Sequence, residues 1–265
     1  MTLALMSQVP VEHGGTGRRA IYISTEAAMS TGRLLQMCDA LDEQHPLLDV
    51  ALDPNNVLAI ICTDLELQDH IMRFQLPTAV ERYNIGLVII DSIAANYRSE
   101  FERPAKRQKD ADGKPIGESG PAQMARRGAE LVNLGQRLKE LARRYNLAVV
   151  VANQVSDRFQ KWGTGQDEDL LALDYQARYF TGWESPEGGK VPALGLVWAN
   201  LLGMRVALRK GNEKEGQVVR RRQAKVVFSG CAEAGKPVCY QIWSGGVRSV
   251  KAEEENVVGG PSIYG

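Results

Sequence analysis

Short apolar segments alternate with longer amphipathic ones over the first part of the chain. The apolar segments are nearly continuous and rich in β-branched residues, at residues 20–25 (AIYIST), 57–62 (VLAIIC), 87–91 (LVIID) and 147–153 (LAVVVAN). Such runs predict strands buried on both faces, as in a parallel sheet covered by helices. In residues 122–145 the apolar side chains recur at spacings of three, four and seven, which predicts one long helix. The alternation predicts an α/β fold: a mainly parallel sheet with helices on both faces.

The pattern changes in the second half of the chain. Residues 96–121 and 155–191 are long, polar segments, which we expect to be functional loops rather than simple connections. Additional β-like stretches near residues 196–208, 218–228 and 238–243 predict C-terminal strands that extend the sheet. We therefore expect one core domain over residues 1–250, followed by a flexible tail at 251–265.

Composition narrows the class of protein. The chain has 265 residues, of which 44% are hydrophobic and 24% charged, so it can bury a sizeable core. Thirty-two basic residues balance thirty-two acidic ones, which excludes binding of nucleic acid through bulk charge alone. The sequence contains neither a long apolar run nor an N-terminal basic-then-apolar pattern, so we expect a soluble intracellular protein that does not bind a membrane. The four cysteines form no CxxC pair, and zinc or disulfides are not expected.

Charge is unevenly distributed along the chain. Residues 34–72 contain no Lys or Arg and many Asp and Glu, whereas residues 205–225 are strongly basic. The basic block is typical of a solvated hairpin rim, which we favour, or of a surface that meets phosphates or an acidic partner.

Polar side chains stand where three of the predicted strands end. Asp91 ends LVIID, Glu26 follows AIYIST, and Asn153 and Gln154 follow LAVVV. Open α/β sheets bind ligands at this edge, where a carboxylate can hold the magnesium ion that bridges nucleotide phosphates. A second carboxylate can activate water, and an amide can sense a terminal phosphate. A simple Asp-Ser turn after the strand is the alternative for Asp91.

The ordered set YISTE, LVIIDSIAANYRSEF, LAVVVANQV and VPALGLVWANLL resembles the core of the RecA/RadA recombinase family over roughly residues 3–245. Within the family it is most similar to the eukaryotic recombination-mediator paralogues, the Rad fifty-seven type of fungi and its vertebrate counterpart. The resemblance implies a RecA-like P-loop NTPase core with extra C-terminal strands. It also implies DNA repair by homologous recombination, in the nucleus, with ATP and Mg²⁺ as cofactors.

The resemblance implies roles for individual residues. Asp91 looks like the Walker B carboxylate that holds Mg²⁺ beside the nucleotide, with Ser92 next to it. Glu26 looks like the catalytic glutamate that polarises the attacking water. Gln154 looks like the glutamine that couples the nucleotide state to DNA. Residues 190–195 (KVPALG), including Lys190 and Pro192, resemble the segment that caps a neighbouring subunit's nucleotide.

Residues 96–121 and 155–191 correspond in the family to the first and second DNA-binding loops. Clustered Lys and Arg on such loops neutralise phosphates with little sequence preference and strong salt dependence. The acidic residues of the first loop dilute this charge, so a solvated linker is the alternative. The residues expected to contact single-stranded DNA are Arg98, Arg103, Lys106, Arg107, Arg126, Arg127, Arg158 and Lys161.

One departure from the family pattern is large. The phosphate-binding loop GxxxxGK[ST] does not occur in the chain, and MTLALMSQVP resembles the helix that follows that loop. Thr2 is therefore not assigned the hydroxyl role of the motif. We expect the preceding core strand to be missing as well, which would leave its neighbours without partners and the isolated chain poorly stable. ATP and Mg²⁺ are then expected to bind only with the missing loop or with a partner subunit, and enzymatic activity is left open.

Three functions are compatible with these features. The first is a mediator subunit that pairs with another recombinase paralogue as a heterodimer and assists the recombinase filament on single-stranded DNA. The second is an interaction subunit that binds no ATP itself, completes a partner's nucleotide site and acts as a scaffold. The residues Glu26, Asp91 and Gln154 favour the first, and the absent loop favours the second. An unrelated P-loop kinase or transporter ATPase is disfavoured, because the sequence contains no Gly-rich phosphate-binding loop that could replace the absent GxxxxGK[ST] motif.

Overall fold

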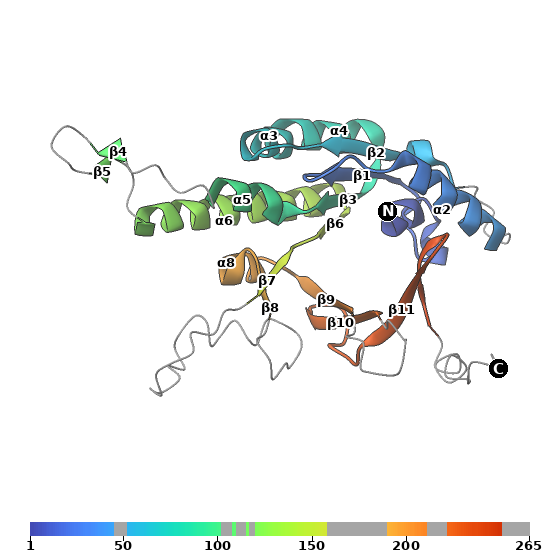
Figure 1. Cartoon of the computed structure of the whole chain (residues 1–265). Coiled ribbons are helices and arrows are strands. Elements are labelled where there is room, and N and C mark those ends of the chain that lie inside the picture. The colour runs from blue at the N-terminus through green and yellow to red at the C-terminus, as the bar shows by residue number, and fades with distance from the viewer. Residues whose placement is uncertain are drawn as a thin grey trace, which may run out of the picture.

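The computed structural model describes residues 1–44, 52–101, 108–109, 115–116, 120–157, 190–210 and 222–250. Within these residues a parallel four-stranded sheet is covered by helices, and a second four-stranded sheet is antiparallel (Figure 1). The predicted α/β class, with helices on both faces and additional C-terminal strands, is confirmed. The described residues include no helix both long and apolar enough to cross a membrane.

The parallel sheet consists of β1 (Arg19–Ser24), β2 (Val57–Ile61), β3 (Ile85–Asp91) and β6 (Ala148–Val151), in the order β2-β1-β3-β6. The two central strands, β1 and β3, are almost entirely buried, as predicted. For β2 and β6 the prediction of burial on both faces is wrong, because exposed and partly buried residues alternate along both. Each of these outer strands has one ladder neighbour among the described residues.

The two faces of the parallel sheet carry separate cores. Alternate residues of β1 and β3 point to opposite faces, so that Ile21 and Val88 belong to one core while Tyr22 and Ile89 belong to the other. The second core is covered by α1 (Thr2–Met6) and α2 (Thr31–Gln44). The first, larger core is covered by α3 (Leu65–His70), η3 (Ile71–Gln75), α4 (Leu76–Tyr83), α5 (Ile93–Phe101), α6 (Gly120–Tyr145) and α8 (Gly195–Ala199). Short 3-10 turns, η1 (Val11–His13) and η2 (Pro54–Asn56), lie in the connections.

The long helix α6 confirms the prediction from periodicity. Its leucines at 131, 134, 138 and 141 are all buried. The first predicted loop, by contrast, starts later than expected, because α5 continues to Phe101 and so includes Asn96 and Tyr97, both buried. Within the rest of that loop, β4 (Gln108–Lys109) pairs with β5 (Pro115–Ile116).

The second predicted loop begins and ends in a two-stranded ribbon. β7 (Val155–Asp157) pairs antiparallel with β8 (Lys190–Pro192). The strand expected over residues 196–208 is wrong in its first part, which forms α8. Trp198 and Ala199 of this helix are buried in the core beside α6, and burial of this apolar cluster decides the local structure.

The C-terminal strands are β9 (Met204–Lys210), β10 (Arg222–Ser229), β11 (Val238–Trp243) and β12 (Gly246–Ser249). They pair in the order β12-β11-β10-β9. They were expected to extend the parallel sheet, but among the described residues they form a sheet of their own (Figure 1). The predicted tail lies outside the described residues, and the domain boundary at residue 250 stays a prediction.

Candidate functional site

The structure brings the predicted polar strand ends together. Glu26 follows the end of β1, Asp91 ends β3, and Gln154 lies just beyond β6. Because the strands are parallel, these residues lie at one edge of the sheet. The Gln154 side chain donates a hydrogen bond from Nε2 to Glu26 Oε1. Ser92 Oγ lies 3.5 Å from the same carboxylate oxygen.

Thr25 fixes the backbone at this edge. Its N–H donates to the Asp91 carbonyl oxygen at 2.9 Å. Its hydroxyl accepts from Ser92 N at 3.0 Å and donates to Ser92 O at 2.6 Å. The peptide bond between Asp91 and Ser92 is cis. The ends of β1 and β3 are thus joined by hydrogen bonds of both the backbone and the Thr25 side chain. Glu26 and Asp91, which lie at these strand ends, are exposed.

Tyr22 holds the Asp91 side chain in place. Its hydroxyl donates a hydrogen bond to Asp91 Oδ2. Burial, followed by this bond to the carboxylate, raises the pKa of the Tyr22 phenol, so the group is a protonated donor at neutral pH. From the sequence pattern alone, Tyr22 is one residue of an apolar strand and is not singled out for the site. The available signal was the strand period of two, which places Tyr22 on the face that Ser24 also occupies, two residues before the strand ends.

Several other groups at this edge are polar and buried. Asn153 Oδ1 and Gln154 Oε1 are buried without a hydrogen-bond partner among the described residues. Buried polar atoms without partners are costly, and they indicate a place where water or a ligand supplies the missing hydrogen bonds.

The segment with Lys190 and Pro192 lies directly beside this edge. Pro192 is buried in β8, and the next residue, Ala193, donates its backbone N–H to Gln154 O at 2.9 Å. The side chain of Lys190 lies outside the described residues. The ribbon of β7 and β8 therefore connects the second predicted loop to the Gln154 backbone.

Few of the predicted DNA-contacting side chains are described. Arg126 is exposed and forms an ion pair with Glu130 at 3.1 Å. Arg127 is half-buried near Tyr97, and burial lowers the pKa of its guanidinium. Burial also raises the pKa of Tyr97 to about 12. The side chains of Arg98, Arg103, Lys106, Arg107, Arg158 and Lys161 lie outside the described residues.

Comparison with known proteins establishes the family. The model of the family described as Rad51 matches residues 1–169, which is more than half of the chain. The chain belongs to the Rad51 family. The family indicated by the ordered sequence motifs is thereby confirmed.

Curated relatives of this Rad51-family chain are DNA repair proteins. It is 40% identical over 221 residues to DNA repair protein rhp57 of Schizosaccharomyces pombe, which covers 79% of this chain and 58% of that protein. It is 31% identical over 188 residues to DNA repair protein RAD57 of Saccharomyces cerevisiae, covering 70% and 37%. It is 29% identical over 261 residues to DNA repair protein XRCC3 of Bos taurus, covering 94% and 64%. The chain spans less than two thirds of the length of these relatives.

The Rad51-family resemblance implies ATP and Mg²⁺, and the described edge fits part of that complex. Carboxylate oxygens such as those of Asp91 and Glu26 suit Mg²⁺, and the two orphaned amide oxygens suit water or other donors. No group of three or more His, Cys, Asp or Glu side chains gathers anywhere in the described segments. The oxygen ligands of this edge therefore have the chemistry that Mg²⁺ prefers.

Proposed function

We propose that this chain is the RecA-like core of a recombination-mediator subunit that acts in DNA repair by homologous recombination in the nucleus. It pairs with another recombinase paralogue as a heterodimer and assists assembly of a recombinase filament on single-stranded DNA. The Rad51-family match and the relatives named as DNA repair proteins support this proposal. The DNA contacts come from the cations of the two loops, together with Arg126 in the N-terminal part of α6.

We further propose that the carboxyl edge of the sheet is one side of an ATP site. The observation that carries this proposal is the contact of Gln154 with Glu26 beside Asp91. Asp91, assisted by Ser92, would hold Mg²⁺, which would supply positive charge beside the phosphates. Glu26 orients a water molecule and accepts its proton. Gln154 is joined to Glu26 on one side and, through its carbonyl, to Ala193 on the other, so it links the site to the ribbon of the second loop.

The substitution Glu26→Gln tests this assignment in the heterodimer with a paralogue partner. We expect ATP hydrolysis to fall by about 100-fold, the usual contribution of a general base, while binding of a fluorescent ATP analogue changes less than about twofold. Glu140→Gln is the matched control, because Glu140 is an exposed glutamate of α6 that pairs with Arg143. Hydrolysis by the Glu26→Gln complex at the rate of the unsubstituted complex would contradict the assignment and place the active site on the partner.

A second function is favoured by the position of residues 190–195. Their backbone bond to Gln154 places this segment at the margin of the site, where it can complete the nucleotide site of a partner instead. In that case the chain is an interaction subunit that binds no ATP itself. Titration of the purified chain with a non-hydrolysable fluorescent ATP analogue separates the two functions, with the fold checked by circular dichroism. Saturable, Mg²⁺-dependent binding supports the first function, and a folded chain that does not bind supports the second.

A further inference from the structure

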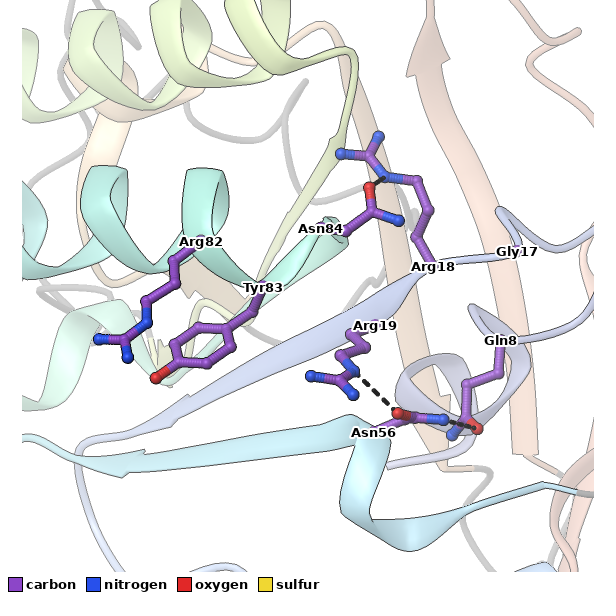
Figure 2. Close-up of a pocket in the computed structure, with 8 residues that line it drawn as sticks. All are labelled: Gln8, Gly17, Arg18, Arg19, Asn56, Arg82, Tyr83 and Asn84. Atoms are coloured by element: carbon purple, nitrogen blue, oxygen red, sulfur yellow. Dashed lines mark hydrogen bonds between the residues drawn. The ribbon is translucent and has the colours of Figure 1, made fainter.

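A second polar site lies at the opposite edge of the parallel sheet. A pocket of about 460 Å³ opens where the chain enters β1, β2 and β3, at their amino ends. Figure 2 shows its lining residues, which are Gln8, Gly17, Arg18, Arg19, Asn56, Arg82, Tyr83 and Asn84. Glu26 and Asp91 lie at the other ends of the same strands, so this pocket is separate from the proposed nucleotide site.

The pocket is lined by three arginines and by no carboxylate. Arg18 is firmly positioned: its Nε donates to Asn84 Oδ1 at 3.0 Å, and its Nη1 donates to the carbonyl oxygens of Asn146 at 2.8 Å and Tyr145 at 3.2 Å. Asn84 has a left-handed backbone, with φ of 52°, which ends α4 and turns the chain into β3. Arg18 is thus held by hydrogen bonds at the C-terminal ends of α4 and α6.

The other two guanidinium groups are held but not neutralised. Arg19 Nε donates to Asn56 Oδ1 at 2.9 Å, and Asn56 in turn donates to the buried Gln8 at 3.1 Å (Figure 2). The guanidinium carbon of Arg82 lies 5.4 Å from the centre of the Tyr83 ring. Within the described part of the chain, neither Arg19 nor Arg82 has an ion-pair partner, and both are exposed. Donors already oriented in this way bind an anion with little loss of side-chain freedom.

We propose that this pocket binds the carboxylate or phosphate groups of a short acidic segment of a partner protein. Guanidinium groups pair with both anions through two parallel hydrogen bonds. A nucleic-acid backbone fits less well, because it is longer than the pocket and its further phosphates would meet exposed carboxylates. Three exposed acidic residues are connected to the lining residues. Glu81 directly precedes Arg82, and the backbone carbonyl of Asp53 accepts a hydrogen bond from the Gln8 side chain. Asp42 accepts a hydrogen bond from the backbone N–H of Leu52, the residue before Asp53. Like charge on exposed neighbours of the lining residues disfavours a long polyanion more than a segment with one or two anionic groups.

Fluorescence anisotropy with the full chain tests the proposal. The probes are labelled six-residue peptides: one of aspartates, one of Gly and Ser with a single phosphoserine, and one of Gly and Ser alone. We expect the two anionic peptides to bind and the neutral one not to bind; the stronger of the two identifies the source of the anion. Arg19→Gln and Arg82→Gln should each weaken binding about 10-fold or more. Arg18 is left intact because its bonds support the fold.

Arg144→Gln is the matched control. Arg144 is exposed and stacks on Tyr145 at the same 5.4 Å as Arg82 on Tyr83, but it does not line the pocket. The affinity of the Arg144→Gln variant for the peptides should stay within about twofold of that of the unsubstituted chain. All variants should unfold at the same urea midpoint. Failure of both anionic peptides to bind overturns the proposal, as does unchanged binding by Arg19→Gln and Arg82→Gln. A labelled single-stranded oligonucleotide is the fourth probe: if Arg19→Gln and Arg82→Gln weaken its binding but not the binding of the peptides, the proposal is overturned in favour of nucleic acid. The assay contains no ATP, so its outcome is independent of the carboxyl-edge site.

Discussion

At the scale of single residues, Cys62 shows how the fold anchors the first helix after the candidate site. It follows β2 and is fully buried. Asn96 of α5 lies 3.6 Å from its sulfur and donates to Gln68 Oε1 at 3.0 Å and to Asp64 O at 3.1 Å. This buried polar cluster connects α5, which begins directly after Asp91 and Ser92, to the end of β2 and to α3. The start of the first predicted DNA loop is thereby attached to the sheet.

Burial of Cys62 gives the chain a testable pH dependence. Burial, aided by the nearby Asp64 carboxylate, raises the pKa of the thiol from 9.0 to about 11. Between these values the unfolded chain loses the proton that the folded chain keeps, so the folded state binds more protons and stability falls as pH rises. The contribution is complete below about pH 9 and lost above about pH 11, and amounts to roughly 2 kcal/mol.

The measurement is urea unfolding between pH 8 and about pH 11 of the unsubstituted chain and of Cys62→Ala. Cys62→Ala should be less stable by about 1 kcal/mol at pH 8 because it leaves a small cavity, but its stability should fall less steeply above pH 9. Cys231→Ala is the control, since Cys231 is an exposed thiol. Parallel pH curves for Cys62→Ala and the unsubstituted chain would show that the Cys62 thiol makes no such contribution.

Residues of the candidate site differ in how far sequence reveals them. Glu26, Asp91 and Gln154 were found because each follows an apolar run, and parallel strands bring their carboxyl ends to one edge. The bonds of Tyr22 and Thr25 to the end of β3 depend on the register between β1 and β3. Periodicity along one strand carries no information on register between two strands, so these partners were missed.

At the scale of elements, the structure differs most from the sequence-based prediction in the burial of β2 and β6, which are not buried on both faces. Their apolar runs resemble those of the central strands, and only the strand order shows that they lie at the edges. The position of α8 was missed for a related reason, since a short apolar run is compatible with either strand or helix. Long amphipathic helices such as α6 are predictable because one stripe of leucines must meet the core.

The C-terminal sheet exposes an apolar face. Paired residues of antiparallel strands share a face, and the register places Leu208 opposite Ala224, Ala224 opposite Val238, and Ile242 opposite Val247. Leu208, Val238, Ile242 and Val247 are 68%, 57%, 56% and 49% exposed. A face of this kind, on a sheet whose outer strand β9 has one ladder neighbour among the described residues, favours association with other chains.

We therefore expect the isolated chain to self-associate at micromolar concentrations, as measured by light scattering after size exclusion. Leu208→Lys should shift the chain towards monomer, because it places a charge on the outer strand β9, at the most exposed large side chain of the apolar face. Val11→Lys is the control, since Val11 is 71% exposed but lies in η1, away from β9. A soluble, monomeric chain that unfolds cooperatively would contradict this expectation and the sequence-based prediction of poor stability.

At the scale of the whole molecule, the two sheets are joined through the layer of α1 and α2. Thr2 Oγ1 accepts from Val247 N at 3.2 Å, and Arg33 Nη2 donates to Trp243 O at 2.6 Å. The Trp243 ring packs against the core beneath α1 and α2, and Arg248 lies 5.0 Å from the ring centre. By contrast, β6 and β9 share no hydrogen-bonded ladder among the described residues. These few contacts predict that the C-terminal sheet opens more readily than the parallel sheet.

Hydrogen exchange of Trp243→Ala tests this division of the molecule. Loss of the ring removes the main apolar contact of β11 with the α1 and α2 layer, and should lower the free energy of opening of residues 238–249 by about 2 kcal/mol, which is about 30-fold in exchange rate. The central strands β1 and β3 should exchange within about twofold of the unsubstituted chain. Trp198→Ala is the matched control, because Trp198 is buried in the other core, and it should loosen α6 and α8 instead. Equal loss of protection in β1, β3 and β11 for Trp243→Ala would show that the two sheets open as one cooperative unit.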